Sequence, residues 1–188
     1  MKAKEKIEHN LKMTMREGME DLLAWMDANG FYDAPCSGKH HLAKAGGLAE
    51  HSLNVLQIAV PLIEYLFLRK EKQISTALIN SAVICSLLHD LGKAGQFDKR
   101  NYILNDDPKK GAFKTNPDLL YVPHEVRSIA IASQFIKLTE EEQFAILYHN
   151  GLYGELQSVK GQETPLYMIL HFADMWASRV AESEDENK

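Results

Sequence analysis

The segment at residues 75–91 constrains the fold more than any other, because its helical pattern is apolar nearly all round. A helix without a polar face must be covered on every side. We therefore expect this helix at the centre of the fold. Gly92 follows it and ends it.

Apolar residues recur at helical spacing in several other parts of the chain. The remaining predicted helices span residues 5–28, 48–68, 123–136, 139–149 and 165–180. Asn29 and Gly30 stop the first, and Thr139 with Glu142 matches a capping box. Residues 93–122 lack a helical period, although residues 102–104 and 112–114 could pair as a short hairpin. The sequence thus predicts an all-α bundle with a long irregular insertion.

A chain of 188 residues fits one domain with its own core. We expect an N-terminal helix within residues 1–30 to pack on a domain of residues 31–181, followed by a frayed acidic tail at residues 182–188. The methionine-rich N-terminal helix could be core or a dimer surface, so a homo-oligomer remains open.

Composition narrows the class of protein. The net charge of −5 disfavours a non-specific nucleic-acid coat, although bound metals can supply positive charge locally. The two cysteines do not form a disulfide framework. The N-terminus does not resemble a signal peptide, and the apolar stretch at residues 55–68 is too short and too broken to span a bilayer. We expect a cytoplasmic protein without a membrane partner.

Two polar residues, His89 and Asp90, come at the end of the most apolar helix. Burying them is costly unless they are paired or bind a metal ion. The alternative is that Asp90 pairs with Lys93 and His89 is a hydrogen-bonded core residue.

Several other histidines and one aspartate lie at inward or terminal helix positions. His51 is on an apolar stripe, His124 starts a helix, His149 ends one, and Asp174 shares a helix face with His171. Each alone could be an ordinary buried or surface residue. Together they resemble a ligand set of imidazoles and carboxylates, which suits manganese, iron, cobalt, nickel or zinc.

Two local strings resemble those of a known family. Residues 46–53 read Gly-Gly-Leu-Ala-Glu-His-Ser-Leu, and residues 87–93 read Leu-Leu-His-Asp-Leu-Gly-Lys. Together they resemble the HD-domain metal-dependent phosphohydrolase superfamily, in particular bacterial and phage members. They are also similar to the HD half of a bacterial 3′-to-5′ exoribonuclease family. The resemblance covers roughly residues 31–180 and implies a helical HD-domain bundle.

The resemblance also implies a metal centre with one or two divalent first-row ions (Mn, Fe, Ni, Co or Zn). One ion would be held by His51, His89, Asp90 and Asp174. In members with two ions, Asp90 bridges them, and His124 and His149 would complete the second site. The roles of His171, His40 and His41 stay open.

The activity implied is hydrolysis of a phosphomonoester or phosphodiester by a metal-activated water, with a phosphorylated small molecule, a nucleotide or a single-stranded nucleic-acid end as substrate. Asp90 and Lys93 would be catalytic, and Lys93 and Arg127 would contact the phosphate. Lys93 could instead be a helix C-terminal cation, and Arg127 a surface residue. The alternative functions are a di-iron oxygenase on the same fold and a non-catalytic regulatory HD domain.

Overall fold

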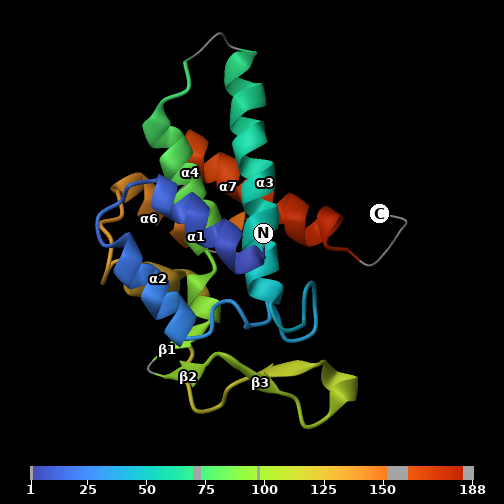
Figure 1. Cartoon of the computed structure of the whole chain (residues 1–188). Coiled ribbons are helices and arrows are strands. Elements are labelled where there is room, and N and C mark those ends of the chain that lie inside the picture. Colours follow the sequence, from blue (N-terminus) through green and yellow to red (C-terminus); the bar gives the residue numbers. More distant parts are fainter. Residues whose placement is uncertain (1, 70–72, 97, 152–160, 184–188) are drawn as a thin grey trace.

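A computed structural model describes residues 2–69, 73–96, 98–151 and 161–183. In this part of the chain it contains seven α-helices, which confirms the predicted all-α class (Figure 1). The helices are α1 (Ala3–Met13), α2 (Met19–Ala28), α3 (Gly47–Leu68), α4 (Thr76–Leu88), α5 (His124–Ala132), α6 (Glu140–Tyr148) and α7 (Pro165–Trp176).

Helix α4 is the predicted central helix. It packs against α1, α3, α6 and α7, and every residue from Ala82 to Leu88 is buried. Ser75 caps its first turn by accepting a hydrogen bond from the backbone N–H of Leu78. Because α4 runs through the core, its C-terminal end delivers His89 and Asp90 directly into the interior.

The prediction of a single N-terminal helix at residues 5–28 is wrong, because the chain breaks between α1 and α2. Met15 and Gly18 have positive φ values of 54° and 82°. Gly18 is required there: a Cβ atom would lie 1.8 Å from the carbonyl oxygen of Phe135. Both helices bury apolar residues, so the helical spacing continues across the break and hides it.

The irregular segment after α4 holds short strands and turns. A 3-10 turn, η1 (Leu91–Lys93), leads into β1 (Gly95–Gln96), which pairs with β2 (Lys99–Arg100). The predicted hairpin is confirmed: β3 (Tyr102–Leu104) pairs antiparallel with β4 (Phe113–Thr115), and a turn, η2 (Pro108–Lys110), lies between them. The β1–β2 pair was not predicted. Figure 1 shows the strands beyond one end of the bundle, away from the C-terminal end of α3.

Helix α3 is 22 residues long and apolar enough, by length and composition alone, to cross a membrane. Its buried residues run from Gly47 to Ile63, and it packs against α4 and α7. These contacts are those of a core helix of the bundle.

The C-terminal helix continues further than α7 itself. A π-helical turn, η5 (Ala177–Ala181), extends it and packs against α3. Glu182 follows, and its side chain is only 1% exposed. The expectation of a frayed tail from residue 182 is therefore wrong at Glu182, and residues 184–188 lie outside the described residues.

A buried ion pair ties the N-terminal helices to α6. Glu142 is fully buried and accepts two hydrogen bonds from Arg16, at 2.7 and 2.9 Å, and one from Ser81 at 2.8 Å. Burial alone would raise the pKa of Glu142, but hydrogen bonds from Arg16, Thr139 and Ser81 outweigh it and lower the pKa. The stability contributed by this pair is present above the usual pKa of glutamate and is lost as pH falls through the lowered value.

Replacing Arg16 with Met leaves the buried Glu142 carboxylate without its cation. We expect the free energy of unfolding to fall by roughly 3 kcal/mol, the low end for a buried pair because Arg16 is itself partly exposed. Lys12→Met is the control, because the Lys12–Glu20 pair is exposed and should contribute about 0–1 kcal/mol. Urea unfolding followed by circular dichroism measures both, and equal losses would contradict the assignment.

Candidate metal centre

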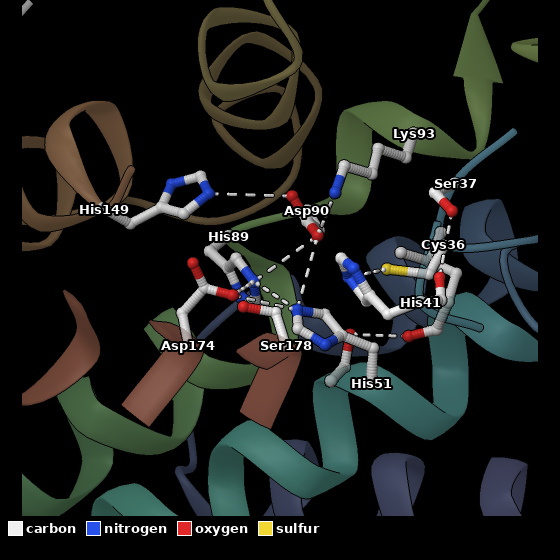
Figure 2. Close-up of polar contacts among 12 residues, drawn as sticks. Cys36, Ser37, His41, His51, His89, Asp90, Lys93, His149, Asp174 and Ser178 are labelled. Carbon is white, nitrogen blue, oxygen red and sulfur yellow. Dashed lines mark hydrogen bonds and ion pairs between the residues drawn. The ribbon is translucent and has the colours of Figure 1, made fainter. Parts of the chain in front are cut away.

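Asp90 is buried and lies at the centre of a group of imidazoles and carboxylates (Figure 2). Its Oδ2 is 3.5 Å from His89 Nε2 and 3.6 Å from His51 Nε2. Asp174 Oδ1 closes this set, at 3.1 Å from His51 Nε2 and 3.9 Å from His89 Nε2. Ligand atoms of His51, His89 and Asp174 lie within 4.8 Å of one another, close enough to hold one metal ion.

The other oxygen of the same carboxylate faces a second set. Asp90 Oδ1 is 3.1 Å from His124 Nε2 and 3.7 Å from His149 Nε2. His89, Asp90 and His149 also present ligand atoms within 4.8 Å of one another. The structure therefore brings together all six predicted ligands, and the two oxygens of Asp90 face different halves of the set.

Hydrogen bonds at the far side of three rings fix their orientation. His89 Nδ1 lies 3.0 Å from the carbonyl of Ser86, and His149 Nδ1 lies 2.7 Å from that of Ile146. A carbonyl only accepts, so both Nδ1 atoms carry the proton and both Nε2 atoms keep a free lone pair. His51 Nδ1 lies 3.0 and 3.1 Å from the two oxygens of Glu182, which orient that ring in the same way.

The protonation states also suit a cation. Burial lowers the pKa of His89 to about 3, so this imidazole is neutral. Burial would raise the pKa of Asp90, but Lys93, His89 and His124 hold it well below the usual range. Burial also opposes protonation of His51, but nearby Cys36, Asp174 and Glu182 raise its pKa well above the usual value. The carboxylates that favour a proton on His51 would equally favour a metal cation beside it.

Five buried side-chain polar atoms lack a hydrogen-bond partner within the described ranges, and two of them belong to this centre. These two are Asp90 Oδ1 and His124 Nε2, which face each other across the second half of the set. Unpaired buried atoms of this kind are costly, and a metal ion would satisfy both. The residues present therefore fit a divalent ion.

Gly92 makes the approach of α5 possible. A Cβ atom at this position would lie 2.4 Å from the carbonyl oxygen of His124 and 2.8 Å from Arg127 Cβ. Its backbone N–H donates to Ser128 Oγ at 2.8 Å. This close packing of α5 on η1 carries His124 to Asp90.

Lys93 belongs to the site and Arg127 does not contact it. Lys93 Nζ donates to Asp90 Oδ2 at 2.6 Å, and its side chain is 15% exposed at the cleft. The expectation that Arg127 faces a phosphate is wrong, because its guanidinium is used within the fold. It donates to Asn101 Oδ1 at 2.9 Å and to the carbonyl of Leu120 at 3.2 Å, which anchors the insertion to α5.

The remaining histidines take other places. His171 Nδ1 donates to the carbonyl of His149 at 2.7 Å, and its ring stacks on Tyr167. It therefore positions the chain at His149 and does not orient Asp174. His40 and His41 line the cleft.

A cleft of about 930 Å³ opens over the centre. The loop before α3, η1, the chain after α6, α7 and the C-terminal segment line it. Asp90, Lys93, His149 and Asp174 reach its wall. Glu182 also lines the cleft, although sequence reasoning assigned it to the tail; its acidic neighbours gave no local signal of burial.

The family model for the HD domain matches residues 48–177, which is most of the chain. The chain belongs to the HD domain family. Members are generally metal-dependent hydrolases, and the ligand set described above lies within the matched residues. No curated protein and no solved structure matches this chain. The finer similarity to an exoribonuclease family therefore stays a prediction.

Removing both imidazoles that face Asp90 Oδ1 tests whether they hold a second metal ion. We expect His124→Ala with His149→Ala to lower the metal content from about two ions per chain to about one, because only the set at Oδ2 remains complete. Elemental analysis after loading with manganese measures this. His9→Ala is the control, since His9 is an exposed residue of α1. Unchanged content in the double variant would rule out a second ion at these residues.

Proposed function

We propose that this protein is a metal-dependent phosphohydrolase that cleaves a phosphomonoester or phosphodiester bond, of a nucleotide or a nucleic-acid end. One observation carries the proposal: the two oxygens of the buried Asp90 carboxylate face separate groups of imidazole ligands. A carboxylate so placed can bridge two ions, an arrangement well suited to phosphoryl chemistry.

The chain's own residues would hold and orient the reactants. One or two divalent first-row ions, when bound, would acidify a water and neutralise charge on the phosphoryl oxygens. Asp90 would bridge them, and the hydrogen bonds at Nδ1 of His89 and His149 would keep both rings aimed at the ions. Lys93, held on Asp90 at the cleft wall, would swing its ammonium to a substrate phosphate oxygen.

The cleft favours a small phosphorylated molecule. Its volume of about 930 Å³ is at the upper end of ordinary ligand pockets, and it would hold a nucleotide. Lys39 and Lys44 lie at its wall, so positive charge is available beyond Lys93. The net charge of −5 disfavours long nucleic acid, and we propose the cytoplasm as its location.

The direct test is hydrolysis by the metal-loaded protein. Nucleoside mono- and triphosphates, cyclic nucleotides, a generic phosphodiester and single-stranded RNA would be compared as substrates. We expect turnover of at least one of them, lost in Asp90→Asn and kept in Asp21→Asn, which changes an exposed residue of α2.

The outcomes separate the alternatives. No hydrolysis of any substrate with any first-row ion would contradict the proposal and favour a regulatory domain. Iron binding with oxygen consumption and no hydrolysis would favour the di-iron oxygenase. Turnover by the Asp90→Asn variant would show that hydrolysis does not use the metal centre.

A second variant tests the role of Lys93. Lys93→Met should raise KM roughly 10- to 100-fold, because a charge-assisted hydrogen bond to phosphate contributes about 1.5–3 kcal/mol. Metal content should not fall, since the ammonium competes with a cation for Asp90 Oδ2. Steady-state kinetics beside Lys12→Met measure the effect. If the variant is less stable but its KM is unchanged, the role of Lys93 is purely structural.

A further inference from the structure

A short loop before α3 folds back on itself and places a cysteine beside a histidine. The N–H of Cys36 donates to the carbonyl of Leu42 at 3.2 Å, and Ser37 Oγ donates to the carbonyl of His41 at 2.9 Å. Ser37 Oγ also accepts from the N–H of His40 at 2.9 Å. These bonds close the loop, so its two ends are held together before any ligand arrives.

Cys36 Sγ lies 3.4 Å from His41 Nε2 (Figure 2). In tetrahedral zinc sites, Zn–S is about 2.3 Å and Zn–N about 2.0–2.1 Å, so the sulfur and nitrogen ligands are about 3.5 Å apart. The observed separation is therefore already that of a ligand pair. Figure 2 shows both side chains at the opposite end of the cluster from His149.

Glu182 offers a further ligand atom beside His41. Its Oε2 is 3.9 Å from His41 Nε2, and its Oε1 accepts from Asn54 Nδ2 at 2.9 Å. His51 also presents a ligand atom within 4.8 Å of those of Cys36 and His41. However, His51 Nε2 faces Asp90 and Asp174, and its Nδ1 is bound to Glu182. A carboxylate has lone pairs for both His51 and an ion, so Glu182 fits better.

We propose that Cys36, His41 and Glu182 form a separate zinc site beside the HD centre. A thiolate and a carboxylate would balance the charge of the ion, and the thiol proton would be released on binding. The sulfur selects a softer ion than the nitrogen and oxygen ligands around Asp90 do. Cys36 is fully buried, whereas the His41 side chain is 23% exposed, which leaves a route for the ion to enter.

Such an ion would join two walls of the cleft. It would bind the loop of residues 36–42 to the C-terminal segment, both of which line the opening. Glu182 would then contact both metal sites, directly at one and through His51 at the other. The site does not depend on the proposed hydrolase activity.

Cobalt substitution distinguishes this site from the HD centre. Co²⁺ would be titrated into reduced, metal-free protein while the near-ultraviolet absorption from thiolate-to-cobalt charge transfer is recorded. The ligands around Asp90 are nitrogen and oxygen atoms and cannot give this absorption. Once all sites are filled, we expect an intensity that corresponds to one thiolate-bound Co²⁺ per chain, and the absorption should disappear when excess Zn²⁺ is added.

Variants assign the signal to its ligands. Cys36→Ser and His41→Gln should abolish the absorption and lower the ion content by one. Cys85→Ser should keep it, because Cys85, the other cysteine of the sequence, is buried in α4. Asp90→Asn should also keep it while losing the ions of the HD centre, so the two proposals fail separately.

No charge-transfer absorption in the wild type would overturn the zinc site, as would absorption that persists in Cys36→Ser. Circular dichroism checks that each variant is folded. If Cys36→Ser does not fold, His41→Gln carries the test, because its side chain is partly exposed.

Discussion

A carboxylate at the end of an apolar helix is the constraint on which the rest of the structure depends. Asp90 is 1% exposed and follows α4, whose last seven residues are all buried. An isolated charge at such a place would cost many kcal/mol. Lys93 compensates from the next turn, and imidazoles arrive from α3, α5 and the end of α6. The bundle is therefore arranged around the Asp90 carboxylate.

The same local arrangement occurs at the C-terminal ends of two helices of this centre. His89 is the C-cap of α4 and His149 is the C-cap of α6, and each ring donates from Nδ1 to the carbonyl three residues earlier. The last carbonyls of a helix have no partner within the helix, so each bond satisfies one of them. At the same time it turns Nε2 toward Asp90. A helix end thus fixes both the tautomer and the direction of a metal ligand, without a separate supporting side chain.

Sequence reasoning succeeded where a residue's place followed from helical periodicity. The central helix and the inward positions of His51 and Asp174 depend on apolar stripes, and the remaining ligands were assigned from the family resemblance. It failed for residues whose contacts depend on segments outside the predicted helices. Arg127 was placed at the phosphate because nothing in the sequence shows that Asn101 and Leu120 come back to meet it. Glu182 was assigned to the tail because its burial depends on η5 packing on α3.

Different parts of the chain hold the metal ligands and form the mouth of the cleft. The ligands around Asp90 are held by α-helices or their caps, whose positions are fixed by the packing of the core. The cleft mouth is formed instead by the loop before α3 and by the C-terminal segment. Such segments tolerate sequence change better than a packed core does. The metal ligands therefore lie within the residues that match the HD domain family, whereas under the proposed function the choice of substrate would depend on the loop before α3 and the C-terminal segment.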